Sequence, residues 1–182
     1  FLELEPEEAF KVQKRYFREY GTTLRGLMDR HEINPREFLD HVHDIDIDVV
    51  PPNPALDRAL ANLPGRKIIF TNADVRHAER VMNRLGVEHH FEAIFDIVAC
   101  DYVPKPEPAV YQALVNRFDI DPEKTVMVED MARNLKPADD IGMTTVWVRT
   151  DTDWGQESSE GDHVHHVVDD LSSWLTDISA IP

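Results

Sequence analysis

The chain has 182 residues and a mass of 21.0 kDa, which suits one core with a small accessory part and is too short for several domains. Its 35 acidic residues outnumber 19 basic ones, and the resulting net charge of −16 argues against nucleic-acid binding, because it repels phosphate backbones. The composition is globular, and no apolar run approaches the roughly 20 residues that span a bilayer, so neither a disordered chain nor a membrane protein fits. With a single cysteine, Cys100, and no signal-peptide pattern, a cytoplasmic location is expected.

The first 50 residues are expected to be helical. Prolines and capping residues predict three amphipathic helices, which begin at Pro6, Thr23 and Pro35. The pattern changes after the proline-rich segment 51–54. We therefore expect a helical cap in residues 1–50 and an α/β core in residues 51–182.

The second part alternates short apolar segments with longer amphipathic ones. Strands are predicted at 67–71, 94–99, 125–128, 144–148 and 164–168, and helices are predicted at 55–63, 75–85 with Asp74 as its cap, 108–118, 132–141 and from about 170. The polar stretch 150–162 is expected to be a loop. This alternation is typical of a Rossmann-like parallel sheet with helices on both faces.

Polar residues follow three of the predicted strands. Thr71 and Asn72 follow the first, Lys105 lies in the loop after the second, and Glu129 and Asp130 end the third. The carboxyl ends of parallel strands meet at one edge of a sheet, where ligands bind. A hydroxyl, an ammonium and two carboxylates gathered there would suit a phosphate group with Mg²⁺, although each residue alone is more often structural.

The order of these motifs resembles the haloacid dehalogenase-like hydrolase superfamily, whose members are mostly phosphatases. Its second, third and fourth motifs match segments 68–72, 103–108 and 126–130, and the resemblance covers about residues 66–150. Segments 20–27 and 129–135 look like the pyrimidine 5′-nucleotidase-like group within it.

The superfamily's first motif, an apolar strand ending in Asp-x-Asp, is absent from the chain. Asp44 and Asp46 have the right spacing, but they follow a helix end and are interpreted as part of a solvated hinge. In the family the missing strand lies in the middle of the sheet, between the strands that end at Thr71 and Val128. Because the chain starts with Phe1 and not with Met, we expect roughly 30 to 45 upstream residues that carry it, unless another copy supplies a strand.

The resemblance implies a mechanism for the intact protein. An upstream aspartate would attack phosphorus, and water would then hydrolyse the aspartyl-phosphate. Thr71 and Lys105 would be catalytic, and Asn72 would donate hydrogen bonds to the substrate. Asp130 would bind Mg²⁺, and Glu129 would be either a further ligand or a hydrogen-bond acceptor beside the ligands. Four residues of the cap are candidates for substrate selection, although they could equally pack or cap the second helix: Tyr20, Thr22, Thr23 and Arg25.

The expected substrate is a small phosphorylated metabolite, with a pyrimidine nucleoside monophosphate as the leading candidate. Several alternatives remain open at this point. The protein could be a phosphosugar phosphatase, a phosphosugar mutase or a haloacid dehalogenase of the same fold, or a relative without a nucleophile that binds phosphate or a partner. The sequence does not indicate an oligomeric state.

Two groups of histidines lie outside these motifs. His163, His165 and His166 could bind a transition metal, but a surface strand is favoured because no fixed fourth ligand is near. His89 and His90 follow a helix end, and the sequence favours a capping role for them.

Overall fold

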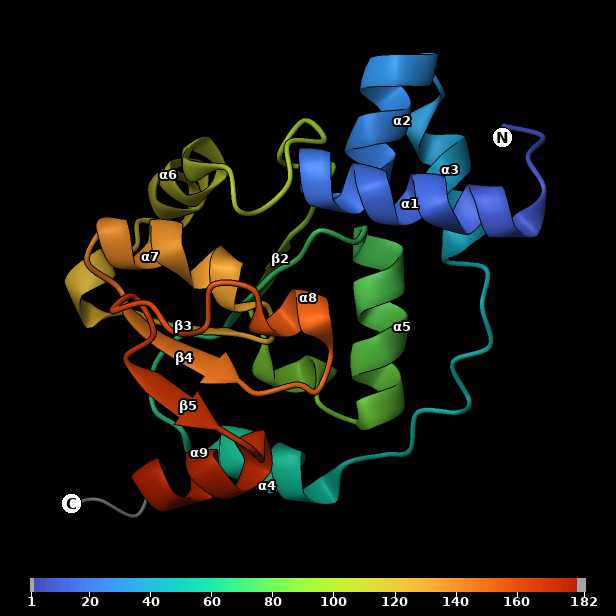
Figure 1. Cartoon of the computed structure of the whole chain (residues 1–182). Helices are drawn as coiled ribbons and strands as arrows, with labels where there is room; N and C mark the ends of the chain where they lie inside the picture. Colours follow the sequence, from blue (N-terminus) through green and yellow to red (C-terminus); the bar gives the residue numbers. More distant parts are fainter. Residues whose placement is uncertain (1, 180–182) are drawn as a thin grey trace.

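The structure, a computed structural model, describes residues 2–179 (Figure 1). Its helices and strands, in chain order, are α1 (Pro6–Tyr20), α2 (Thr23–His31), α3 (Pro35–Val42), α4 (Pro54–Asn62), β1 (Ile68–Phe70), α5 (Val75–Leu85), η1 (Glu88–His90), β2 (Ala93–Phe95), α6 (Pro108–Phe118), η2 (Pro122–Lys124), β3 (Val126–Glu129), η3 (Ala132–Leu135), α7 (Lys136–Asp140), β4 (Thr144–Val148), α8 (Asp153–Gln156), β5 (His166–Val168) and α9 (Leu171–Ser179). Within the described part of the chain, no helix combines the length and the apolar character needed to cross a membrane.

The three predicted N-terminal helices are confirmed, and they lie together at one end of the molecule (Figure 1). Proline occupies the first turn of α1, where its missing N–H costs nothing, and two acidic residues complement the helix dipole there. The Thr22 hydroxyl accepts a hydrogen bond from the Arg25 N–H and so caps α2. Asn34 caps α3 in the same way through the Arg36 N–H.

Helices α1 and α2 pack closely at Gly26. A Cβ atom at this position would lie 2.5 Å from Cβ of Tyr16, whose side chain is buried. The Tyr16 hydroxyl lies 2.8 Å from Nε2 of His31, which ties the far end of α2 to the same residue. The small side chain at position 26 therefore sets the distance between the two helices.

Gly26→Ala is expected to lower the free energy of unfolding by about 2 kcal/mol, because the α1 backbone fixes the position of Tyr16 Cβ and rotation of the side chain cannot move this atom away. Helix propensity alone would favour alanine by about 1 kcal/mol. Urea unfolding measures the difference, and the exposed Arg18→Ala on α1 is the control, with an expected change below about 0.5 kcal/mol. A Gly26→Ala protein as stable as the parent would contradict the close packing.

The strands form two parallel sheets, one of β1 and β2 and the other in the order β3-β4-β5. Side chains of β1 alternate between two hydrophobic clusters, since Ile68 and Phe70 pack with α6 and α7 and Ile69 packs with α4, α5 and α9. Helices therefore cover both faces of the strands, and α4 and α9 lie side by side (Figure 1). The predicted fold class, an α/β fold with parallel strands and helices on both faces, is confirmed.

Strands β1 and β3 each have a partner on one side only. Within residues 2–179, β1 pairs with β2 alone and β3 with β4 alone. Both strands contribute to the same cluster, through Ile68 and Phe70 on β1 and Met127 on β3. The exposed fractions of Val126 and Val128 are 52% and 37%, although valines inside a covered sheet are normally buried. The sheet order agrees with the expectation that these two strands are not direct neighbours.

Some predicted boundaries were wrong. The second strand ends at Phe95 and not at residue 99, because the Asp96 carboxylate accepts the N–H groups of Ala99 and Val75 and bends the chain into a turn. The helix predicted over 132–141 is a 3₁₀ turn followed by α7, because Pro137 has no N–H to donate and fits only in the first turn of a new helix.

The region after β4 also differs from the prediction. Segment 150–162 contains the short helix α8 rather than only loop. The last strand starts at His166 and not at residue 164. His163 lies before this strand and is buried, and its backbone carbonyl accepts a hydrogen bond from the Thr145 hydroxyl at 2.6 Å, so the expected row of surface histidines does not form.

Candidate functional site

The predicted strand-end residues begin with Thr71, directly after β1. Its backbone N–H donates to the carbonyl of Phe95, which continues the pairing of β1 with β2 for one residue. Its hydroxyl oxygen accepts the N–H of Ala73 at 3.0 Å. The hydroxyl hydrogen can still be donated, so Thr71 can hold an oxygen of a ligand at this edge of the sheet.

Asn72 binds the backbone of Lys105 through both halves of its amide. Its Oδ1 accepts the Lys105 N–H at 2.8 Å, and its Nδ2 donates to the Lys105 carbonyl at 3.3 Å. This pair of bonds fixes the loop after β2 against the end of β1. The predicted role of Asn72 as a donor to the substrate stays a prediction, and the structure adds a positioning role.

Lys105 and Glu129 form a buried ion pair between the ends of β1 and β3. Their side chains are 7% and 8% exposed. The ammonium donates to the Glu129 carboxylate and, at 2.9 Å, to the carbonyl of Phe70. Burial acts to raise the pKa of Glu129, but the charge of Lys105 and hydrogen bonds outweigh it and hold this pKa below its ordinary value. Glu129 is therefore ionised, and its ion pair with Lys105 joins the two sheets.

Among the residues that the structure describes, none forms a basic ion-pair partner of the Asp130 carboxyl. Its partial removal from water, followed by a hydrogen bond and the negative charge of Glu129, raises its pKa to about 6. Its backbone is fixed, since the Asp130 carbonyl accepts the indole N–H of Trp147 at 3.0 Å. The site thus holds two carboxyl groups and one ammonium, and the excess negative charge is concentrated on Asp130.

This donor set fits Mg²⁺. The ion prefers oxygen ligands, and proteins usually bind it through one or two carboxylates with water and phosphate. Partial burial and the negative charge of Glu129 raise the pKa of Asp130, and a cation bound beside both carboxylates would offset this repulsion. Glu129 already binds Lys105 and the Met131 N–H, so Asp130 is the residue that would hold the ion and Glu129 supports it.

The cap reaches this site through Gly21. This residue has φ +81°, and a Cβ here would lie 3.1 Å from Pro104 and 3.3 Å from the Lys105 carbonyl. Glycine therefore provides both the turn after α1 and the close approach. Arg133, after β3, donates to the carbonyls of Phe17 and Gly21 at 3.4 and 3.3 Å. No local sequence pattern marks either contact, because they join residues 80 or more positions apart.

The four cap candidates for substrate selection have partners within the cap. Arg30 donates to the Tyr20 hydroxyl, Thr22 caps α2, Thr23 donates to the Gln13 carbonyl, and Arg25 pairs with Asp29. These contacts match the packing and capping alternative. The structure thus brings Thr71, Asn72, Lys105, Glu129 and Asp130 together, whereas contact of the cap residues with substrate stays a prediction.

Cys100 lies near this edge of the sheet but is a poor nucleophile. Burial, followed by the charges of Asp96 and Asp101, raises its pKa to about 11. The thiolate is the reactive form of cysteine, so this thiol is almost entirely protonated at neutral pH.

Comparisons with known proteins assign the chain to a family. A family model for haloacid dehalogenase-like hydrolases matches residues 4–142. N-acetylmuramic acid 6-phosphate phosphatase from Pseudomonas aeruginosa is 27% identical over 82% of this chain and 71% of its own length. Phosphate metabolism protein 8 from Saccharomyces cerevisiae is 25% identical over all of this chain and 61% of its own length.

The fold also matches solved structures. L-2-haloacid dehalogenase from Xanthobacter autotrophicus, with chloropropionic acid covalently bound, superposes with a TM-score of 0.59 at 15% identity, over 96% of this chain and 83% of that one. At this identity the likeness concerns the fold alone.

Proposed function

Because this chain belongs to the haloacid dehalogenase-like hydrolases, we propose that it is a Mg²⁺-dependent phosphomonoesterase acting on a small phosphorylated metabolite. The observation that carries the proposal is the buried Lys105–Glu129 pair beside Asp130, at the carboxyl ends of β1 and β3. The phosphatase name of the Pseudomonas aeruginosa relative supports the choice of phosphate esters as substrates.

Each residue has a part in this reaction. Lys105 would offset the negative charge of the phosphoryl group, and Thr71 would donate its hydroxyl hydrogen to a phosphoryl oxygen. Asn72 would keep the Lys105 loop in place through its two backbone hydrogen bonds. Asp130 would hold Mg²⁺, which neutralises developing charge on the transferred group when bound. The cap would exclude water through the contact of Gly21 with the Lys105 loop.

The nucleophile is proposed to come from outside the described residues. The unpaired sides of β1 and β3 could both be satisfied by one further strand, and such a strand would end beside Lys105. The first aspartate of an Asp-x-Asp motif at that end would attack phosphorus, and the second would give its proton to the leaving alcohol. Water, losing a proton to the same carboxylate, would then cleave the aspartyl-phosphate and release phosphate. The complete protein is therefore the right material for activity measurements.

A pyrimidine nucleoside monophosphate is the leading substrate of the proposal, on the resemblance of segments 20–27 and 129–135. Sugar phosphates are the second candidate, favoured by the names of relatives such as the phosphorylated carbohydrates phosphatase of Thermotoga maritima. Phosphate release from a panel of both classes, with Mg²⁺ and with EDTA, tests the proposal. Metal-dependent release from either class supports it, whereas no phosphate release together with chloride release from 2-chloropropionate would indicate a dehalogenase.

Mg²⁺ affinity is expected to fall at acidic pH. The ion binds the ionised form of Asp130, whose pKa is about 6, so lowering the pH from 7 to 5 should weaken Mg²⁺ binding by about tenfold. Calorimetric titration at both pH values measures the change. Asp130→Asn is the control, and its residual affinity should vary much less; an equal pH dependence in the parent and the control would assign the titration to another group.

A further inference from the structure

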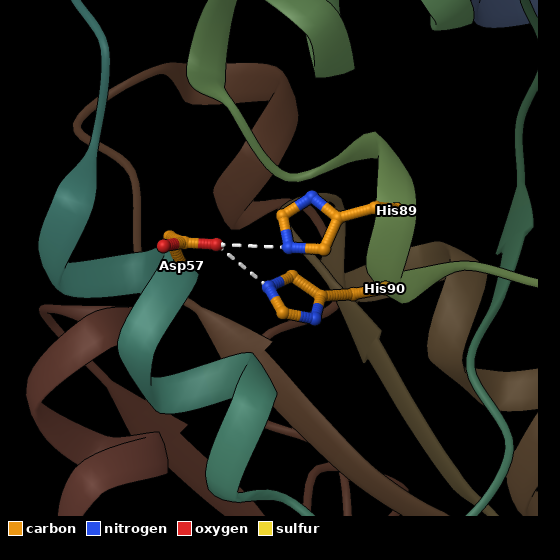
Figure 2. Close-up of side chains that lie close together, drawn as sticks. All are labelled: Asp57, His89 and His90. Carbon is orange, nitrogen blue, oxygen red and sulfur yellow. Dashed lines mark hydrogen bonds and ion pairs between the residues drawn. The ribbon is translucent and has the colours of Figure 1, made fainter.

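A second group of possible ligands lies away from this site, where two imidazoles point at one carboxylate oxygen (Figure 2). Nε2 of His90 is 2.8 Å and Nε2 of His89 is 3.3 Å from Oδ1 of Asp57. Ligand atoms of the three residues all lie within 4.8 Å of one another, and within residues 2–179 no other set of three or more His, Cys, Asp or Glu residues meets this condition.

The capping role that the sequence favoured for His89 and His90 is wrong, because neither residue caps α5. Gly86 ends that helix, and its N–H donates to the carbonyls of Met82 and Asn83. His89 and His90 instead lie in η1, and both rings project toward the first turn of α4, which carries Asp57 (Figure 2). The cluster therefore joins two elements that are about 30 residues apart in the sequence.

We propose that Asp57, His89 and His90 bind one transition-metal ion, with Zn²⁺ as the reference case. Zinc takes imidazole nitrogen and carboxylate oxygen at about 2.0–2.2 Å in a tetrahedron, whose corners lie about 3.3–3.5 Å apart. The two Nε2–Oδ1 separations, 3.3 and 2.8 Å, fall short of this edge by at most about 0.7 Å, and all three ligand atoms lie within 4.8 Å of one another, so side-chain movements of about one ångström would complete the geometry. Three protein ligands leave the fourth position to water.

The exposure of the three side chains suits ion entry. His90 is 10% exposed and so is held in place, Asp57 is 39% exposed, and His89 is 67% exposed. An ion can reach the cluster from solvent, and the His89 side chain can move the short distance that coordination requires. Imidazole ligands also favour zinc, cobalt and nickel over Mg²⁺, which prefers oxygen.

This site is separate from the proposed Mg²⁺ site. His90 comes three residues before β2 begins, toward the amino ends of the strands, whereas Thr71 and Asn72 follow the carboxyl end of β1. Elements α4 and η1 flank the hydrophobic cluster that contains Leu60 and Val87. A bound ion would therefore tie these two elements together and stabilise the core, without touching the phosphate ester.

Competition between EDTA-treated protein and a chromophoric chelator for Zn²⁺, at neutral pH in millimolar Mg²⁺, tests the proposal. About one Zn²⁺ per chain should bind with a dissociation constant in the micromolar range or below. His89→Gln and Asp57→Asn should each weaken binding by at least about tenfold. His166→Gln and Asp130→Asn should leave the affinity unchanged, because these residues lie on β5 and at the Mg²⁺ site.

A thermal melt separates loss of the site from loss of the fold. Zn²⁺ should raise the melting temperature of the parent but not that of His89→Gln, whose exposed side chain can change without disturbing the core. Millimolar or weaker Zn²⁺ binding, or equal affinity in the parent and in both cluster variants, would overturn the proposal. Weaker binding in His166→Gln or Asp130→Asn instead would move the ion to those residues and overturn it equally.

Discussion

Lys105→Ala is expected to lower phosphate release at least about 100-fold, because the transferred group loses the ammonium that offsets its charge. The same change should cost about 3–5 kcal/mol of stability, since it leaves the Glu129 carboxylate buried without its partner. Steady-state kinetics and urea unfolding of the purified variant measure the two effects.

A double variant separates the two effects. Lys105→Ala with Glu129→Gln removes the unpaired charge, so most of the lost stability should return while activity stays low. Recovery of both stability and activity would mean that Lys105 acts only by neutralising Glu129. If Lys105→Ala alone retains more than about one tenth of the parent rate, Lys105 does not take part in the reaction.

Asp130→Asn is expected to lower Mg²⁺-dependent turnover at least about 100-fold and, in EDTA, to raise stability at neutral pH. The first effect follows from the loss of the charged ligand. The second follows from the direction of the shift in pKa: the folded protein binds this proton more tightly than the unfolded chain does, so ionisation of Asp130 lowers stability as the pH rises from about 4 to 7. The asparagine cannot ionise and escapes this loss.

Melting temperatures in EDTA at pH 4 and pH 7 test the stability effect of Asp130→Asn. The variant should be more stable than the parent at pH 7 and should differ from it much less at pH 4, where Asp130 is protonated in the folded parent protein and about half protonated in the unfolded chain. The exposed Asp151→Asn, on a loop of the same core, is the control and should show no such difference. An Asp130→Asn protein less stable than the parent at neutral pH would show that the carboxylate is compensated by a cation already present in the fold.

The parts of the fold that follow from local chemistry could be predicted. Helix starts at Pro6, Pro35 and the residue after Asp74 depend on capping residues and prolines within a few positions, and the structure confirms all three. The end of β2 could not be predicted, because Asp96 bends the chain partly through a hydrogen bond to Val75, on another element.

In the candidate site, too, some residues could be predicted from the sequence and some contacts could not. Thr71, Lys105 and Asp130 could be selected because each follows or adjoins a predicted strand, and parallel strands place their ends at one edge. The two bonds from Asn72 to the Lys105 backbone, and the three-residue cluster at Asp57, depend on pairs of residues 32 or 33 positions apart, and no local pattern marks such pairs.

Two arginines of α5 hold the backbone of the segment between α3 and α4. Arg80 on α5 donates to the carbonyls of His43 and Ile45, at 2.6 and 2.8 Å, and Arg84 donates to the carbonyl of Asp48. Carbonyl groups are the same in every amino acid, so the side chains of this acidic stretch can change during evolution while the anchor persists. Among relatives we therefore expect Arg80 and Arg84 of α5 to be conserved, while the sequence of the segment between α3 and α4 varies.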